Sequence, residues 1–210
     1  MLIACEESQR VCNEFRKLGH EAYSCDILET SGDHDEWHLK VDALQMLKIE
    51  WDLVIAFPPC TYLSNAGACR LYPKKGQLNM ERYQKGLQAK EFFLRFWENP
   101  NCKHIAVENP VASRVFEMPQ CTQEIQPWQF GHPVTKKTRL WLKGLPPLMP
   151  TEIVEPTAPY VPAGTSRKDV TKYGRAFRTG KDSVQRSKTF PGLARAMATQ
   201  WSEYLLQEGE

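Results

Sequence analysis

Long apolar runs are missing from this sequence of 210 residues. No stretch reaches the roughly 18 apolar residues that a membrane-spanning helix needs, so we expect no membrane partner. The N-terminus also lacks a basic stretch followed by an apolar core, and we therefore expect no secretory signal. Hydrophobic residues make up 41% and charged residues 25% of the chain, which is typical of an ordinary globular protein.

Paired cysteines with CxxC spacing are also missing. The seven cysteines are an odd number, which argues against a disulfide framework and a zinc cage and favours a reducing compartment, the cytoplasm. At least one thiol is then free for chemistry. The five histidines are scattered without ligand spacing, so we expect no catalytic metal.

A strong net charge is absent, because the formal total is only +2. The charge is unevenly placed: residues 163–188 hold eight Lys and Arg and two Asp, a local charge of +6 that leaves −4 for the rest of the chain. Such a basic segment favours a phosphate-bearing partner. The alternative is a solvated loop with no partner.

Apolar patterning predicts an alternation of strands and helices. Strands are expected over residues 1–4, 21–25, 51–57, 104–107 and 138–142, and helices over 8–19, 42–48, 80–97 and from Pro191 onward. Residues 61–79 predict a long loop, which could act as a lid because Gly67 and Gly76 permit hinging. The alternation is typical of a doubly wound, mostly parallel α/β sheet.

Three regions are expected along the chain. Residues 1–145 carry the strand and helix pattern and predict a catalytic and cofactor-binding α/β domain. Residues 146–188 combine a proline-rich strap with the basic segment, and residues 189–210 predict a C-terminal helix that packs back on the α/β domain. The sequence makes no prediction about oligomeric state.

The stretch WDLVIAFPPCTYLSNAG places Cys60 directly after Pro58 and Pro59, at the end of an apolar run. In a doubly wound sheet, ligands bind beyond the carboxyl ends of the strands, where Asp26 and Glu108 are also expected. The prolines fix the backbone direction. A thiolate attacks electron-poor rings, and a carboxyl group can bind the polar edge of a base. The alternatives are an inert buried thiol and a carboxylate that caps the next helix.

Several segments follow one another in the order known from a family of enzymes. They read LIACEESQRVCNEF, SCDI, KVDAL, FPPCTYLSNAG, VENP, QPWQFGHPVTKKTRLWLKG and SKTFPGLARAMATQW. Together they resemble the S-adenosylmethionine-dependent cytosine-5 DNA methyltransferases, in particular small phage-type members. The resemblance implies a Rossmann-like methyltransferase sheet and methyl transfer from S-adenosyl-L-methionine to carbon 5 of cytosine.

The resemblance also implies a role for individual residues. Cys60 would attack carbon 6 of cytosine, Glu108 would hold the ring nitrogen and exocyclic amine, Asn109 would support the Cys60 loop, and Arg139 would contact the base or its phosphate. The cofactor would lie against Ala4, Glu6, Ser8, Asp26, Ile27, Asp42, Ala43, Pro58 and Ser187. The substrate would contact Pro59, Ser64, Lys137, Arg175 and Arg178.

The chain departs from the family pattern in two places. The loop at residues 5–9 contains no glycine, although the family usually has glycines there. Only residues 146–188 stand where a target-recognition domain is expected, which leaves little protein to read base edges. DNA methylation of low sequence specificity, action on single strands, and action on a free cytidine nucleotide all remain open. A catalytically silent homologue that binds nucleic acid or a partner is a further alternative.

Overall fold

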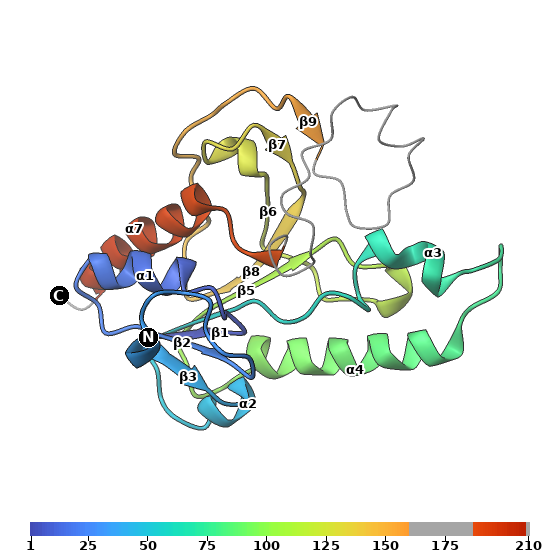
Figure 1. Ribbon diagram of the computed structural model, residues 1–210, viewed down its shortest axis with the longest axis horizontal. Coiled ribbons are helices and arrows are strands. Elements are labelled where there is room, and N and C mark those ends of the chain that lie inside the picture. Colours follow the sequence, from blue (N-terminus) through green and yellow to red (C-terminus); the bar gives the residue numbers. More distant parts are fainter. Residues whose placement is uncertain (160–186, 209–210) are drawn as a thin grey trace. The chain divides into compact units, whose positions relative to one another are not determined.

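The computed structural model describes residues 1–159 and 187–208. A seven-stranded sheet has the order β3-β2-β1-β4-β5-β8-β6 (Figure 1). Its strands are β1 (Leu2–Ala4), β2 (Tyr23–Asp26), β3 (His38–Lys40), β4 (Leu53–Ala56), β5 (His104–Pro110), β6 (Gln123–Ile125) and β8 (Thr138–Lys143). The pairs β1–β2, β1–β4, β2–β3 and β4–β5 are parallel, and β5–β8 is antiparallel. The mostly parallel α/β sheet predicted from the sequence is confirmed.

The central strands are buried along their whole length, which explains their continuous apolar sequence. All residues of β1 and β4 are completely buried, as expected for parallel strands covered on both faces. Phe93 and Phe96 of helix α4 (Met80–Trp97) belong to this core. The rings of Phe93 and Trp141 pack edge to face, with their centroids 4.8 Å apart. Such a pair stabilises the fold by about 0.5–1.5 kcal/mol beyond its buried area.

Short helices connect the remaining strands. They are α2 (Ala43–Met46) and α3 (Ala68–Leu71), with 3₁₀ turns at Asp35–Trp37, Asn65–Gly67, Arg114–Phe116 and Pro127–Gln129. The loop predicted over residues 61–79 therefore contains a 3₁₀ turn and a helix. Leu63 and Leu71 anchor its first half in a buried cluster with Phe116, whereas residues 72–77 are exposed. A lid would be confined to that exposed stretch.

The chain divides into two compact units. The first consists of Met1–Gln9, Glu21–Glu124 and Thr138–Pro147, and the second of Arg10–His20, Ile125–Lys137 and Leu148–Glu210. The boundaries predicted at residues 145 and 188 stay predictions. In the second unit, helices α1 (Arg10–Lys17) and α7 (Pro191–Glu208) pack side by side (Figure 1).

Hydrogen bonds join distant segments within the second unit. The Arg10 guanidinium donates to the carbonyl oxygen of Thr189 at 2.7 Å, and the amide of Gly192 donates to His132 Nε2 at 3.0 Å. Strands β7 (Val134–Thr135) and β9 (Ala158–Pro159) pair in parallel. Helix α7 begins at the predicted Pro191.

Helices α1 and α4 differ in how far their apolar residues are buried. Helix α1 ends at Lys17, one residue before Leu18, which is 49% exposed and lies outside the core. In α4 the fully buried positions are Gly86, Phe93 and Phe96, while Leu87, Leu94 and Trp97 are partly buried at the margin of the packed face.

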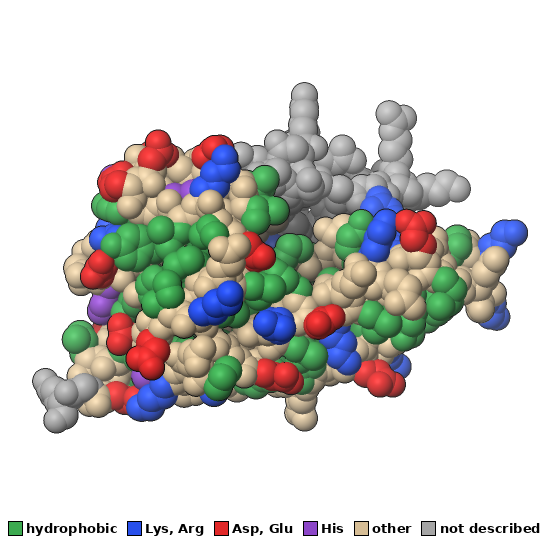
Figure 2. Space-filling model, turned by 90° about the horizontal axis from the view of Figure 1, so that it is seen from below, with side chains coloured by type: hydrophobic (Ala, Val, Ile, Leu, Met, Phe, Trp, Pro, Cys, Tyr) green, Lys and Arg blue, Asp and Glu red, His purple; other side chains and the backbone are tan. Residues whose placement is uncertain are grey.

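Acidic and basic side chains are interspersed on the face of the protein that Figure 2 shows. No large area of one sign covers the described part of that face.

Candidate functional site

The carboxyl ends of the parallel strands form the edge at which the sequence predicted a site. The chain winds from β1 to β2 and β3 on one side, and to β4 and β5 on the other. Strand order therefore reverses between β1 and β4, and in open α/β sheets ligands bind beyond the carboxyl ends at such a point. Cys5 and Glu6 follow β1 there, and Phe57 and Pro58 follow β4.

The Cys60 turn is tied to the end of β5. The register pairs Ala56 of β4 with Val107 of β5, so the Pro-Pro-Cys turn leaves β4 beside Glu108. Glu108 itself lies inside β5, which continues to Pro110 instead of ending at the predicted residue 107, because residues 108–110 pair with β8. Asn109 donates from Nδ2 to the carbonyl oxygen of Pro58 at 3.1 Å. Cys60 and Glu108 are both partly exposed, so a ligand beyond this edge has access to both side chains.

The backbone after Cys60 forms a tight, braced turn. The Cys60 carbonyl oxygen accepts hydrogen bonds from the amides of Leu63 and Ser64, at 3.1 and 2.8 Å. The Ser113 amide donates to the Leu63 carbonyl at 2.8 Å, which fastens the turn to the chain that follows β5. The Ser64 hydroxyl accepts from the Ala66 amide and caps a 3₁₀ turn. Pro59, unlike the buried Pro58, is exposed.

Arg139 lies on β8, across from Asn109 in the register of β5 and β8. Because side chains alternate along a strand, Arg139 shares a face with Asn109, and Glu108 projects to the opposite face. The Arg139 guanidinium contacts Glu124 through two nitrogens, at 2.9 and 2.8 Å. Only a ligand that lies beyond the edge, rather than on one face, is within reach of both Glu108 and Arg139.

Two predicted cofactor acids lie near the ends of β2 and β3. Asp26 is the last residue of β2, and its Oδ1 accepts from the Leu28 amide at 3.0 Å. Asp42 caps helix α2, with Oδ1 accepting from the Leu44 amide at 3.0 Å. Beside Asp26, Ile27 is 70% exposed. The arrangement offers a carboxylate next to an apolar surface.

Two thiols sit at this edge without being nucleophiles. Burial raises the pKa of the Cys5 thiol, and the negative charges of Asp26, Cys25 and Asp42 add to the rise. Burial, with the charges of Asp26 and Asp42, raises the pKa of Cys25 to about 12, while its hydrogen bond to the Val41 carbonyl acts in the opposite direction. Both groups stay protonated at neutral pH, and only a thiolate attacks an electrophile well.

The glycine-poor first loop reaches an unusual backbone conformation without glycine. Cys5 and Gln9 have φ angles of 58° and 55°, in the left-handed region that favours glycine. The buried Gln9 side chain accepts from the His34 amide at 3.1 Å and donates to the His34 carbonyl at 2.6 Å. Gly32 leaves room for Gln9, because a Cβ at position 32 would lie 2.3 Å from Gln9 Oε1. Sequence reasoning found no role for Gln9 because its partner lies 25 residues away.

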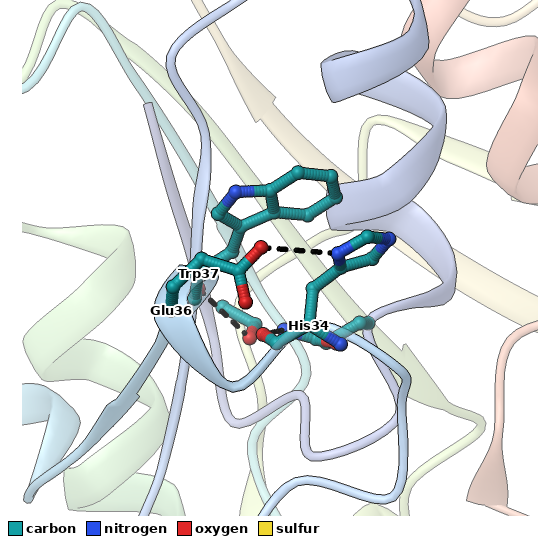
Figure 3. Close-up of polar contacts among 5 residues, drawn as sticks. His34, Glu36 and Trp37 are labelled. Carbon is teal, nitrogen blue, oxygen red and sulfur yellow. Dashed lines mark hydrogen bonds and ion pairs between the residues drawn. The ribbon is translucent and has the colours of Figure 1, made fainter.

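An aromatic stack completes the loop between β2 and β3. The rings of His34 and Trp37 lie parallel, with centroids 3.6 Å apart and an interplanar angle of 18°. Glu36 contacts His34 Nδ1 at 3.1 Å (Figure 3). Together with Gln9, this stack fixes the chain beside the exposed Ile27. Two aromatic rings in a loop are only a weak signal in a single sequence.

The other predicted residues are distributed as follows. Ala4, Glu6 and Ala43 are buried, and Ser8 is partly exposed in the first loop. Lys137 and Ser187 are exposed residues of the second unit. Arg175 and Arg178 lie outside the described residues. The structure thus brings together the ends of β1, β2, β4 and β5 and the Arg139 strand.

The described residues show neither a metal-binding cluster nor a membrane-spanning helix. Over residues 1–159 and 187–208, no three His, Cys, Asp or Glu side chains group so that they could hold a metal ion. Within the same ranges, no helix combines the length and the apolar character that crossing a bilayer requires. None of the seven cysteines, which all belong to the described ranges, forms a disulfide bond.

The chain has only weak similarity to known proteins. No family model and no curated protein matches this chain. One matching solved structure is described as a DNA modification methyltransferase encoded within a prophage (E. coli). It has a TM-score of 0.43 and 13% identity, and the match covers 73% of this chain and 51% of that chain. The match thus spans about half the length of that structure. Similarity of this degree does not indicate an activity.

Proposed function

We propose that this protein is an S-adenosylmethionine-dependent methyltransferase that modifies carbon 5 of cytosine in DNA through a covalent bond to Cys60. One observation carries the proposal. Cys60 follows the end of β4, Glu108 lies on the neighbouring strand β5 one residue past its pairing with β4, and Asn109 bonds the backbone of the Cys60 turn. A nucleophile and a group that binds a ring edge are then carried by the adjacent strands β4 and β5, the first of which borders the point where the strand order reverses.

Cys60 is the nucleophile. Its sulfur forms a bond to carbon 6 of cytosine, which moves an electron pair to carbon 5 and makes that atom nucleophilic. After carbon 5 has gained the methyl group, it loses its proton to a base. The electron pair of that C–H bond then restores the double bond and expels the Cys60 sulfur. Glu108 binds the ring edge as a neutral carboxyl group: its O–H donates to the ring nitrogen, which gains negative charge as the sulfur attacks, and its other oxygen accepts from the exocyclic amine.

Asn109 is a positioning residue in this scheme. It is 1% exposed, and its Nδ2 holds the Pro58 carbonyl in place. Each of the two prolines restricts φ, so Asn109 and the prolines fix the direction in which the chain delivers Cys60. Fixed placement of a nucleophile lowers the entropy lost on reaching the transition state.

The residues at the ends of β1 and β2 fit S-adenosylmethionine. The Asp26 carboxylate suits the ribose hydroxyls, and the exposed Ile27 offers an apolar surface to a flat ring. Asp42 and Pro58 border the same edge. When bound, this cofactor supplies a methyl group on a positively charged sulfur. The carboxyl groups of Asp26 and Asp42 are compatible with that positive charge.

The remaining predicted contacts belong to the same proposal. Arg139 would contact the base or its phosphate, which requires exchange of its bond to Glu124. Ser64, Pro59, Lys137, Arg175 and Arg178 would contact the substrate, and Ser187 the cofactor. With residues 146–188 in place of a recognition domain, we expect low sequence specificity.

A mechanism-based trap tests the proposal. The protein is incubated with S-adenosylmethionine and an oligonucleotide that contains 5-fluorocytosine. The fluorine cannot leave as the proton does, so the Cys60 adduct accumulates and is seen as a mass shift of the protein. Cys60→Ser abolishes the adduct. Cys69→Ser, which removes an exposed thiol nine residues away, serves as the matched control and retains it.

The results separate the alternatives. An adduct that survives in Cys60→Ser would eliminate the proposed nucleophile. An adduct with 5-fluoro-deoxycytidine monophosphate but with no oligonucleotide would assign the enzyme to free cytidine nucleotides. No adduct with any substrate, together with strand binding, would favour a catalytically silent nucleic-acid-binding protein.

A further inference from the structure

An aromatic ring and three cations gather beside the Cys60 turn. Tyr62 lies two residues after Cys60, and the Arg82 guanidinium carbon and Lys85 Nζ lie 5.0 and 5.8 Å from the centre of its ring. Arg70, on the neighbouring helix α3, is exposed. With Asn79 and Glu81 these residues line an open notch of about 230 Å³, hereafter the Tyr62 notch.

The Tyr62 notch carries a net positive charge. It holds three cations and one acid, Glu81, which binds Lys85 at 2.6 Å. Within the described residues Arg70 makes no hydrogen bond or ion pair, so its charge is available to a ligand. A net charge of this sign in a concave site attracts anions. The volume lies below the roughly 300–1,000 Å³ of a pocket that encloses a complete small ligand.

The Arg82 side chain is hydrogen-bonded to the backbone of the loop that follows Cys60. One of its terminal nitrogens donates to the Thr61 carbonyl oxygen at 2.7 Å. Its Nε is buried and lacks a hydrogen-bond partner among the described residues. An unpaired buried donor is uncommon and calls for an explanation. The carbon of this guanidinium lies 5.0 Å from the centre of the Tyr62 ring, two residues after the proposed nucleophile.

We propose that the Tyr62 notch binds the nucleotide that adjoins the target cytosine in single-stranded DNA. This inference rests on the proposed function. Cations bind the phosphates while an aromatic ring stacks on a base, which is the usual chemistry of sequence-tolerant single-strand binding. Two residues of chain span at most about 7 Å, so the notch lies within one or two nucleotides of Cys60.

The notch favours a polymer over a free nucleotide. A mononucleotide held between Cys60 and Glu108 ends at its own phosphate and has no second base for Tyr62. Reading a duplex, by contrast, requires a helix or a strand pair that enters a groove, and the notch is a shallow concave site beside a turn. The inferred substrate is therefore a strand whose bases are already unpaired.

Fluorescence anisotropy with a labelled single strand of about twelve nucleotides tests this inference. We expect Tyr62→Leu to weaken binding by about 5- to 150-fold, the range measured for loss of one stacked base. Arg70→Gln should weaken binding and reduce the slope of log K against log salt by about 0.7, the value for one phosphate contact on a single strand. Arg95→Gln, an exposed cation at the other end of α4, is the matched control and should change neither quantity.

Three outcomes would overturn the inference. The first is that Tyr62→Leu and Arg70→Gln both bind the single strand with the same affinity as the unmodified protein. Arg95→Gln could weaken binding as much as Arg70→Gln, which would reveal unspecific attraction. Duplex DNA could bind more tightly than the single strand. Both substituted residues are exposed, so circular dichroism should show unchanged folding.

The trapping experiment keeps this inference separate from the proposed function. Tyr62→Leu should slow adduct formation with a 5-fluorocytosine oligonucleotide but leave the adduct with the mononucleotide unchanged. Equal slowing with both substrates would contradict the notch as a site for the neighbouring nucleotide. If no substrate forms an adduct but strand binding still depends on Tyr62 and Arg70, the proposed function fails and the notch stands.

Discussion

At the scale of single residues, the thiols near the sheet edge differ in their environments. Cys5 and Cys25 lie close to Asp26 and Asp42, and burial together with these charges keeps both protonated. Cys60 follows two prolines and is partly exposed. The sequence singled out Cys60 because of its prolines, whereas the effect of the acids on the other two thiols required their placement in space.

The raised thiol pKa values predict a loss of stability at alkaline pH. An unfolded cysteine titrates near 8.5, whereas Cys25 in the folded protein titrates at about 12. Between these values the unfolded chain releases a proton that the folded chain retains, so the free energy of unfolding falls as pH rises from about 8.5. Urea unfolding at a series of pH values from 8 to 10 measures this.

Substitutions at two cysteines isolate this contribution. Cys25→Ala removes one of the titrating groups, so its stability should decline less steeply with pH than that of the unmodified protein. Cys69→Ala, at an exposed thiol, should leave the slope unchanged. Equal slopes for all three proteins would show that the Cys25 thiol does not control this pH dependence.

At the scale of elements, helix α4 depends on a glycine in its interior. Alanine at an exposed helix position stabilises by about 1 kcal/mol relative to glycine. At position 86, however, a Cβ would lie 2.2 Å from the ring of Phe116, which is buried and stacked on Tyr83 at 5.7 Å. A contact this short forces the ring or the helix to move. Gly86 therefore sets the distance between α4 and the segment that follows β5.

We predict that Gly86→Ala destabilises the protein in spite of the better helix propensity. Overpacking in a filled core costs about 1–3 kcal/mol, which outweighs the gain in propensity. Chemical denaturation measures the change. Gln88→Ala, at an exposed position two residues further along the helix, should stay within about 0.5 kcal/mol of the unmodified protein. The double variant Gly86→Ala with Phe116→Leu should recover part of the loss, and failure to recover any would place the strain elsewhere.

The elements found from sequence and those missed differ in length and in partners. The strands that begin near residues 2, 23, 53, 104 and 138, and the helix Met80–Trp97, were all predicted, because each is an apolar run or a long periodic segment. Strands β3, β6, β7 and β9 have only two or three residues, too few for a pattern. Helix α3 was missed because its surroundings contain glycine and proline, and tertiary packing of Leu71 overrides that local signal.

Residues of the candidate site were predictable to different degrees. Cys60 and Glu108 were named because residues after buried strands share an edge, and the register of β4 and β5 places their strands side by side. The bond from Gln9 to His34 and the contact of Arg82 with Tyr62 were not predicted. Each joins side chains about 20 residues or more apart through an amide or a guanidinium, and one sequence holds no signal for such pairs.

At the scale of the whole molecule, the proposed site residues are concentrated in one part of the chain. All four proposed catalytic residues, and every proposed cofactor residue except Ser187, belong to the first compact unit. A ligand that binds folded protein and not unfolded chain stabilises the folded state by mass action. Cofactor binding therefore has a readout in thermal unfolding that does not depend on a substrate.

We predict that S-adenosylmethionine raises the melting temperature. At 100 times its dissociation constant, a ligand adds about 2.7 kcal/mol, which corresponds to about 5–10 °C for a chain of this size. Asp26→Asn keeps the bond to the Leu28 amide but removes the negative charge, so it should lose most of the shift. Asp52→Asn, at an exposed acid before β4, should keep it. If the unmodified protein shows no shift at millimolar cofactor, the edge formed by β1 and β2 does not bind it. The silent nucleic-acid-binding alternative would then account better for a chain that retains Cys60 and Glu108.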